Sequence, residues 1–306
     1  MLTLKCKKGN SIQKLEQIVG YYQSPLKNED PHSIWIGGAG EILGLSGSVG
    51  KNHFLNTIQG YRPDTEEALV QRPGYIRRYG WDMTFSPPKS VSIVWAISDP
   101  KPRRELELAH QEAIITVITH IEDHYSLGRR GRNGVQKEKV KLLAAVFLHF
   151  ISREGDPQIH THVFLQNLAW YPDSDWGCLD LKPVYCDQKK LGALYREELS
   201  RRLGSLGFSI EKLKESFRIQ GISEEMEKEF SRRNERIKEK KRESVYRGGR
   251  SSNIASLSTR PDKSWESLAE VEKEWEVRLR KIEIDKDFIE GLKNNFDRSL
   301  ISRLGI

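Results

Sequence analysis

The fold of this chain depends most on the segment VKLLAAVFLHFISREGDPQIHTHVFLQ, residues 140–166. Two runs of apolar, β-branched and aromatic residues flank a central stretch rich in turn-forming residues, which predicts a β-hairpin. Side chains alternate along a strand, so His160 and His162 share one face and Thr161 lies on the other. His149 joins that face if it pairs opposite His160 or His162, and we expect one of these two registers.

Three imidazoles close together on one sheet face would bind a divalent metal ion and leave coordination positions open for a substrate. The alternative is that the three side chains are unrelated and half exposed on a solvated surface. Three of the eight histidines of the chain stand at i, i+2 and a hairpin partner position, which coincidence explains poorly. The pattern therefore favours a metal site made by His149, His160 and His162.

The composition is that of a globular protein with one large or two medium domains. Of the 306 residues, 37% are hydrophobic and 30% are charged. No apolar run approaches the roughly 20 residues of a membrane span, and the N-terminus reads as a short strand rather than a signal peptide. The three cysteines lack CxxC spacing, so neither a disulfide framework nor a cysteine zinc site is expected. We expect a cytoplasmic protein with no membrane span.

Positive charge is unevenly distributed along the chain, whose formal net charge is +7. Residues 232–250 hold nine basic side chains against three acidic ones. A second cluster consists of Arg129, Arg130 and Arg132, followed by three lysines. Such clusters, with glycine and asparagine in the loops, suit contact with a phosphate backbone. A solvated helix face explains either cluster equally well when it is taken alone.

A tyrosine pair and a lone aspartate are further candidates for function. Residues 11–20 have the spacing of an amphipathic helix, which brings Tyr21 and Tyr22 to its end or just beyond. Such a pair more often serves packing or the surface. Asp82 stands in an apolar and aromatic strand pattern, and if it is buried it needs a partner such as an imidazole or a hydroxyl. The alternative for Asp82 is an exposed position near a turn.

A glycine-rich segment at 35–52 has some features of a phosphate-binding P-loop. The pattern GxxxxGK[ST], set on Gly50 and Lys51, needs glycine at position 45 and serine or threonine at position 52. The chain has Leu45 and Asn52 there. We therefore exclude an NTPase site in this segment.

Strand and helix patterns alternate through most of the chain and give way to helix alone toward the C-terminus. The apolar run at 89–95 reads as a strand, and helices are expected at 103–126 and 188–203. These elements predict an α+β fold, a palm with a mostly antiparallel central sheet of about five strands flanked by helices. The change of composition predicts a first domain at 1–222 and a helical extension at 223–306.

Three separate motifs occur in this chain in a distinctive order. They are the tyrosine pair at 21–22, WDMTFSPPKSVS at 81–92 and HFISREGDPQIHTH at 149–162. Together they resemble the motifs of the TrwC/TraI-type (MobF) conjugative relaxases, which belong to the HUH endonuclease superfamily. The likeness extends over about residues 1–240.

This resemblance implies a site- and strand-specific DNA nickase and strand transferase of plasmid conjugation or mobilisation. Such an enzyme cuts one DNA strand at an origin of transfer and stays joined to its 5′ phosphate through a tyrosine. The match assigns Tyr21 as the nucleophile and Asp82 as the base or the orienting carboxylate. His149, His160 and His162 match the metal ligands, with Mg²⁺ or Mn²⁺ as the expected ion and Zn²⁺ as an alternative.

Two features depart from the family pattern. Relatives often have a second tyrosine group, but residues 24–35 contain none, so a second transesterification would use Tyr22 or a second subunit. Many relatives also carry a C-terminal helicase that these 306 residues lack, so we expect an isolated domain or a short mobilisation protein.

The implied substrate is single-stranded DNA at an origin of transfer, with accessory relaxosome and coupling proteins as further partners. The domain at 1–222 would be the catalytic HUH palm, and basic helices within 223–306 would close over the strand as a clasp. Ten basic side chains are the expected DNA contacts: Lys89, Arg129, Arg130, Arg132, Arg153, Arg232, Arg233, Arg236, Arg247 and Arg250.

Three other functions are compatible with these residues. A rolling-circle replication initiator of the HUH class would use the same chemistry in another pathway. A single-stranded DNA-binding module would keep the fold but would not cut. Metal-dependent hydrolysis without a covalent tyrosine would leave a free 5′ phosphate and no protein–DNA adduct.

Overall fold

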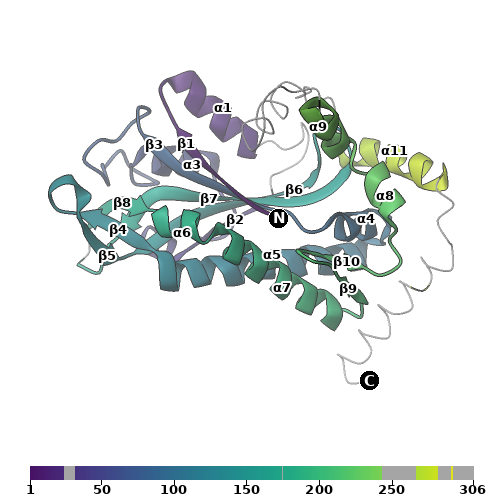
Figure 1. Cartoon of the computed structure of the whole chain (residues 1–306). Helices are drawn as coiled ribbons and strands as arrows, with labels where there is room; N and C mark the ends of the chain where they lie inside the picture. The colour runs from purple at the N-terminus through teal and green to yellow at the C-terminus, as the bar shows by residue number, and fades with distance from the viewer. Residues whose placement is uncertain (24–31, 174, 243–266, 282–290, 292–306) are drawn as a thin grey trace.

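One antiparallel sheet organises the molecule (Figure 1). The computed structural model describes residues 1–23, 32–173, 175–242, 267–281 and 291. Eight strands form this sheet in the order β1-β3-β7-β8-β4-β5, and β6 joins it by pairing with β7 on one side and with β2 on the other. The strands are β1 (Leu2–Lys8), β2 (His32–Ile36), β3 (Arg78–Phe85), β4 (Leu127–Arg130), β5 (Gln136–Lys139), β6 (Lys141–Ile151), β7 (Pro157–Trp170) and β8 (Trp176–Asp180).

The expected α+β architecture is confirmed, with a larger sheet than the five strands predicted. The additional strands include β4 and β5, which have four residues each and few apolar side chains. Backbone hydrogen bonds hold such short polar strands together, and a side-chain pattern does not reveal them. A separate two-stranded sheet is formed by β9 (Ile210–Lys212) and β10 (Phe217–Ile219).

Helices cover both faces of the sheet. In Figure 1, α5 and α7 lie below it, and α1 and α3 lie above it. The helices expected at 103–126 and 188–203 are confirmed as α5 and α7. The helical elements before residue 210 are α1 (Ile12–Gln23), α2 (Gly38–Ile42), α3 (Lys51–Gln59), α4 (Lys89–Ile97), α5 (Pro100–Tyr125), α6 (Lys182–Cys186), α7 (Gln188–Ser205) and the short 3₁₀ helix η1 (Arg132–Gly134).

The central strand β7 separates two hydrophobic cores. Its 14 residues pair with β3, β6 and β8. Val163 and Leu165 pack into the lower core with α5 and α7, whereas Phe164 and Leu168 pack into the upper core with α1 and α3. Because side chains alternate along a strand, His160 and His162 project to the same side as Phe164. The histidine face of the sheet is therefore the face that α1 covers.

One expected strand is a helix. The apolar run at 89–95 forms α4, which starts directly after Pro88, and six of its consecutive side chains are buried. A helix that is buried all round shows a continuous apolar run, which periodicity cannot distinguish from a buried strand. The strand prediction was wrong for this reason.

The described part of the C-terminal extension is helical. It consists of α8 (Glu224–Glu229), α9 (Arg232–Arg242) and α11 (Leu268–Lys281). Trp275 of α11 meets Trp95 of α4 edge-on at 6.0 Å, and Phe230 belongs to the same core. Met226 of α8 and Trp275 of α11 therefore join the lower core under the sheet, whereas no described residue of α9 does. The boundary near residue 222 stays a prediction.

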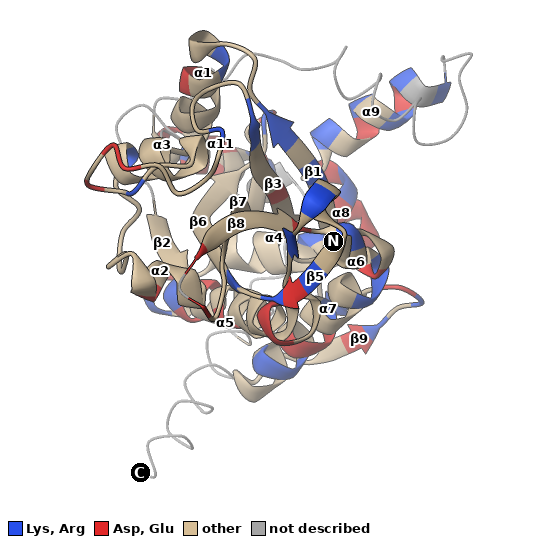
Figure 2. Ribbon diagram, turned by 90° about the vertical axis from the view of Figure 1, so that its left-hand side faces the viewer, with Lys and Arg blue, Asp and Glu red and all other residues tan. Residues whose placement is uncertain are grey.

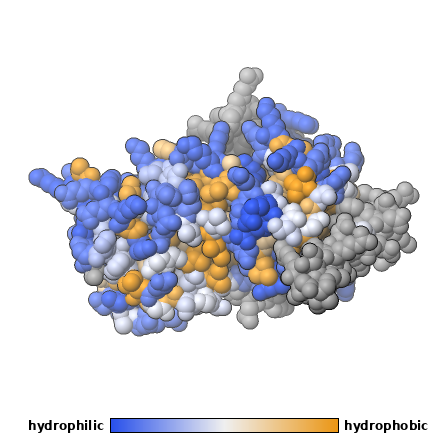
Figure 3. Space-filling model, turned by 90° about the horizontal axis from the view of Figure 1, so that it is seen from below, coloured by the Kyte–Doolittle hydropathy of each residue, from blue (hydrophilic) through white to orange (hydrophobic). Residues whose placement is uncertain are grey.

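None of the described helices is both long and apolar enough to cross a membrane. The most apolar of them, α4, is buried inside the molecule. Seen from below, the surface shows hydrophobic side chains in separate patches between hydrophilic ones (Figure 3).

Candidate active site and metal centre

Three histidine side chains meet on the face of the sheet that α1 covers. Strands β6 and β7 pair in the register that places His149 opposite His160, one of the two registers expected. The three ring centroids lie 5.1–5.3 Å apart, and one nitrogen from each ring lies within 4.8 Å of the others. The prediction that His149, His160 and His162 share one face of the sheet is confirmed.

Hydrogen bonds set the tautomers of two of the rings. Nδ1 of His160 donates to the carbonyl oxygen of Gln158 at 2.9 Å, and Nδ1 of His162 donates to Asp82 Oδ1 at 2.8 Å. Carbonyl and carboxylate oxygens only accept, so both neutral rings carry the proton on Nδ1 and the lone pair on Nε2. Bonds of this kind orient imidazoles that bind metals. The donor set of this cluster therefore fits a divalent metal ion.

Asp82 is buried beside His162 and has further partners. Its carboxylate accepts a hydrogen bond from Thr84 Oγ1 at 3.3 Å and pairs with the Lys7 ammonium group at 3.3 Å. Burial alone would raise the pKa of Asp82, but the hydrogen bond and electrostatic attraction from His162, together with the charge of Lys7, outweigh it and hold that pKa well below its usual range. The expectation that a buried Asp82 needs an imidazole or a hydroxyl is confirmed.

Tyr21 brings a phenol hydroxyl to the histidine cluster. It lies in the last turn of α1, and its hydroxyl oxygen is 3.2 Å from Nε2 of His162. Its ring stands edge-on to the rings of His162 at 5.4 Å and His149 at 6.1 Å. The ammonium nitrogen of Lys7 and the guanidinium carbon of Arg153 each lie 5.9 Å from its ring centre. A phenol, three imidazoles and two cations are therefore gathered at one site.

Tyr22, the next residue, is completely buried. Its ring stacks on Phe147 at 5.3 Å and meets Phe54 and Phe164 edge-on. Burial and the neighbouring Asp82 carboxylate raise the pKa of its hydroxyl well above 10. Consecutive residues of a helix point about 100° apart. The hydroxyl of Tyr21 therefore reaches Nε2 of His162, whereas Tyr22, whose ring also stands edge-on to His162 at 5.4 Å, packs in the core.

Comparison with known proteins identifies the family. A family model described as TrwC relaxase matches residues 5–282. The chain belongs to the TrwC relaxase family. The multifunctional conjugation protein TraI of Escherichia coli K12 is 32% identical over an alignment 244 residues long, which covers 75% of this chain and 13% of TraI. The chain thus spans only 13% of the length of this curated relative.

Solved structures of a TrwC relaxase share the fold. The metal-free complex of conjugative relaxase TrwC with OriT DNA is 27% identical, with a TM-score of 0.81 over 93% of this chain and 99% of that one. A copper-bound complex gives the same values. A metal-bound complex gives a TM-score of 0.82. The relaxase resemblance of the sequence motifs is confirmed.

Lys7 is the residue of this TrwC-family site that the sequence analysis missed. It lies on β1, which pairs with β3 so that Lys7 stands opposite Gly80 and Lys5 opposite Asp82. A lysine on an edge strand usually protects that edge from pairing with other chains. No local signal marks Lys7, because only the pairing of two distant strands brings it to Asp82.

Three arginines that were predicted to contact DNA form ion pairs with the turn of the histidine hairpin. Arg232 pairs with Asp156 at 2.9 Å, Arg236 pairs with Glu154 at 2.9 Å, and Arg233 approaches Glu154 at 3.8 Å. All three lie on α9, whose ribbon in Figure 2 shows basic residues in blue with acidic residues in red between them. These ion pairs dock α9 against the hairpin, and DNA contact by the three arginines stays a prediction.

Lys89, another expected DNA contact, is bonded to the same hairpin. Its ammonium group donates to the carbonyl oxygen of Pro157 at 2.9 Å. Burial lowers the pKa of Lys89 to about 8, although the Asp156 carboxylate acts in the opposite direction. Lys89 therefore supports the start of β7 in this structure. Arg247 and Arg250, the last two expected contacts, lie outside the described residues.

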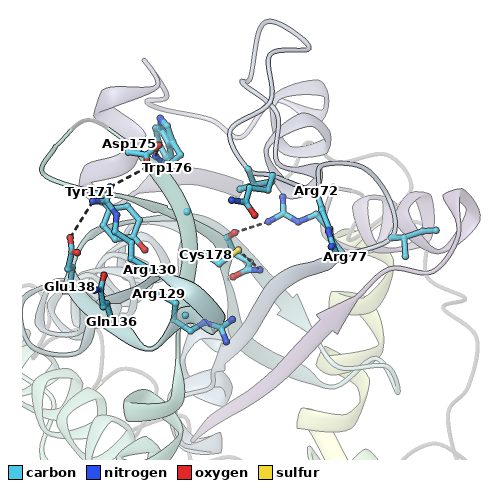
Figure 4. A pocket seen from close by; sticks show the side chains of 17 residues that line it. Arg72, Arg77, Arg129, Arg130, Gln136, Glu138, Tyr171, Asp175, Trp176 and Cys178 are labelled. Atoms are coloured by element: carbon cyan, nitrogen blue, oxygen red, sulfur yellow. Dashed lines mark hydrogen bonds and ion pairs between the residues drawn. The ribbon is translucent and has the colours of Figure 1, made fainter.

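A cavity of about 770 Å³ lies where β4 and β8 meet the loop before β3 (Figure 4). Arg130 pairs with Asp173 at 2.6 Å and lies over the ring of Tyr171 at 4.1 Å. Positive and aromatic side chains around one cavity suit contact with phosphates and bases. Arg132 follows this strand in η1. Four arginines line the cavity: Arg72, Arg77, Arg129 and Arg130. The sequence analysis singled out only Arg129 and Arg130.

Proposed function

We propose that this chain is a site- and strand-specific DNA nickase and strand transferase of plasmid conjugation or mobilisation. The observation that carries the proposal is the Tyr21 hydroxyl 3.2 Å from Nε2 of His162, within a cluster of three imidazoles. A phenol beside a metal-binding cluster is suited to attack a phosphodiester. The OriT DNA bound in the TrwC complexes supports DNA as the substrate.

The reaction would exchange one phosphodiester for another. A bond forms between the Tyr21 phenol oxygen and the scissile phosphorus, and the bond from phosphorus to the 3′ oxygen breaks. Tyr21 gives up its proton and the departing 3′ oxygen takes one up, which leaves a 3′ hydroxyl and a 5′-phosphotyrosine adduct. Because the ester is kept, the strand can be rejoined without ATP, and no P-loop pattern is needed at 35–52.

We assign Asp82 to orienting His162 rather than to proton transfer. A carboxylate whose pKa is held low is a weak base. The Oδ1 atom of Asp82 also already accepts a hydrogen bond from Nδ1 of His162. Lys7 pairs with the other carboxylate oxygen and lies near the Tyr21 ring, where its charge would favour the phenolate. Arg153 is equally near that ring and would contact the incoming phosphate.

His149, His160 and His162 would hold the metal. A divalent ion held there would supply Lewis-acid stabilisation of the negative charge that develops on the scissile phosphate. Imidazole nitrogens favour later transition metals such as Zn²⁺, whereas Mn²⁺ and Mg²⁺ prefer oxygen ligands such as phosphate and water. We propose Mn²⁺ as the working ion, because phosphate and water oxygens would complete its coordination, with Zn²⁺ as the alternative. The copper-bound TrwC complex supports a transition metal.

Tyr22 is poorly placed for a second transesterification. Its complete burial keeps it from a DNA strand, and its raised pKa makes the phenolate costly to form. Of the two routes expected from the sequence, we therefore propose the second subunit, whose own Tyr21 would carry out the second strand transfer.

The DNA surface would extend from the histidine cluster to the arginine-lined cavity. Arg129, Arg130 and Arg132 place positive charge there, which favours phosphate contact. The palm at 1–222 would carry the chemistry, and the extension at 223–306 would cover the strand as a clasp anchored to the hairpin turn. Accessory relaxosome and coupling proteins and a cytoplasmic location belong to the same proposal.

Incubation with a panel of single-stranded origin-of-transfer oligonucleotides and Mn²⁺ tests the proposal. A denaturing gel should show protein-linked DNA with the wild type and with Tyr22→Phe, and none with Tyr21→Phe. Tyr22→Phe is the matched control because it removes the same hydroxyl from the adjacent ring. An adduct formed by Tyr21→Phe would rule out Tyr21 as the nucleophile, and cleavage in excess EDTA would rule out the metal.

A further inference from the structure

The two histidines of β7 flank a residue that is held from the opposite side of the sheet. The side chain of Thr161 is buried on the face covered by α5 and α7. There its hydroxyl is 2.8 Å from Nε2 of His110, and Nδ1 of His110 is 2.8 Å from the hydroxyl of Tyr195. His110 belongs to α5 and Tyr195 to α7, so one chain of hydrogen bonds joins both helices to the strand.

This network is placed where polar groups are costly. The exposed fraction of all three side chains is 0%, and Tyr195 packs against Phe85 at 5.3 Å. Three apolar side chains of similar shape would fill the same space without the cost of removing polar groups from water. A buried network whose members are all hydrogen-bonded instead specifies one geometry of its surroundings. Here the network fixes the conformation of the strand segment that lies between two of the three clustered histidines.

The network carries no net charge beneath the histidine cluster. Burial lowers the pKa of His110 to about 3, so its ring is neutral at neutral pH. Burial also raises the pKa of Tyr195 well above 10, so its phenol keeps the proton. A cation bound on the other side of β7 is therefore not repelled by these residues.

We propose that His110, Thr161 and Tyr195 are positioning residues for the metal centre. By holding the Thr161 side chain from below, they fix the backbone of β7 on either side of it and thereby the angle between the imidazoles of His160 and His162. The inference rests on the proposed metal-binding role of the histidines.

The pairing of the strands explains why such support is needed. Phe85 of β3 and Leu148 of β6 stand opposite Thr161. Just beyond this point the ladder between β6 and β7 is irregular, with a register shift between His149 and Ile151. Bulges of this kind bend the strand and leave residues unpaired. The backbone ladder alone therefore constrains this end of the hairpin less than its centre.

The test compares the Mn²⁺ affinity of the wild-type full chain with that of variants that change one side chain of the network. Thr161→Val removes the hydroxyl, and we expect its Mn²⁺ affinity to fall about tenfold. Thr161→Ser restores the hydroxyl and should recover most of that loss. Tyr195→Phe removes the far end of the network and should cause a smaller loss. The electron paramagnetic resonance signal of free Mn²⁺ measures binding, with no DNA present.

Thr57→Val is the matched control. Thr57 is equally buried, and its hydroxyl accepts a hydrogen bond from Gln166 of the same strand at 2.9 Å. It should leave the Mn²⁺ affinity unchanged. Equal affinities of wild type and Thr161→Val, or an equal loss in Thr57→Val, would overturn the inference. If thermal unfolding in EDTA shows that Thr161→Val does not fold, Tyr195→Phe decides by the same comparison.

Measuring metal binding without DNA separates this inference from the proposed function. A wild type that binds no Mn²⁺ would overturn the metal centre and this inference together. A wild type that binds Mn²⁺ but forms no DNA adduct would contradict the nickase proposal, and the Thr161 variants would still decide the positioning role.

Discussion

Nδ1 of His162 donates a hydrogen bond to Asp82 Oδ1 at 2.8 Å, and both side chains are buried. The carboxylate sets the tautomer of the imidazole and fixes the orientation of the ring, so that the lone pair of Nε2 is available to a metal. Lys7 pairs with the other oxygen, so that the carboxylate is not an isolated buried charge. The affinity of the histidine cluster for a metal ion should therefore depend on Asp82, which lies outside the cluster.

Asp82→Asn should weaken metal binding. The substitution keeps the shape of the side chain and removes the charge that orients His162, so we expect Mn²⁺ affinity to fall about 10- to 100-fold. Isothermal titration calorimetry of the full chain measures this change. Asp64→Asn is the control, because Asp64 is an exposed carboxylate paired with His53. Unchanged affinity in Asp82→Asn would show that the carboxylate does not orient the ring.

The buried His110 predicts a pH dependence of folding. Burial lowers its pKa to about 3 in the folded chain, against about 6.5 in the unfolded chain. Above the unfolded value the ring is neutral in both states. Below it only the unfolded state binds the proton, so the free energy of unfolding falls as the pH falls toward about 3.

Comparison with His110→Gln isolates this contribution. Relative to the variant, the wild type should lose about 1 kcal/mol of unfolding free energy per pH unit between about pH 6 and pH 4. Urea unfolding in EDTA at several pH values measures the difference and keeps metal binding out of it. Two parallel pH profiles would contradict the assignment.

Asp156→Ala should destabilise the protein strongly. The Asp156 carboxylate is fully buried and pairs with Arg232 at 2.9 Å and with Arg278 at 2.8 Å. Its removal takes one partner from the buried guanidinium group of Arg278, which keeps Glu229 at 3.0 Å, so we expect a loss of about 2–3 kcal/mol, less than the roughly 3–5 kcal/mol of a buried charge left unpaired. Glu67→Ala breaks an exposed ion pair with Arg62 and should cost less than about 1 kcal/mol. Equal losses in urea unfolding of the two variants would refute the prediction.

Arg129→Ala should reduce the salt dependence of DNA binding. Arg129 lines the cavity at β4, and loss of one phosphate contact lowers the slope of log affinity against log salt by about 1. Fluorescence anisotropy with an origin oligonucleotide at several salt concentrations measures the slope. Lys214→Ala is the control, because Lys214 is an exposed lysine in the turn between β9 and β10. The prediction fails if both variants keep the wild-type slope.

The histidine cluster could be predicted because its geometry is local. A turn of a few residues limits the pairing of the two strands to a small set of registers, and alternation along β7 keeps His160 and His162 on one face. The need of Asp82 for a hydrogen-bond partner followed in the same way from its apolar neighbours. The identity of α4 could not be predicted, since a fully buried run shows no period.

The strand period of two placed His160 and His162 on one face, and the short turn limited His149 to a few registers, of which the structure has His149 opposite His160. The packing of distant segments settled which tyrosine joins them, because that depends on the face of α1 that lies on the sheet. The contact between Tyr21 and His162 spans 141 residues, Lys7 reaches Asp82 from another strand, and His110 bonds to Thr161 from the opposite face of the sheet. Such contacts depend on the packing of the whole core, and no pattern of neighbouring residues encodes them.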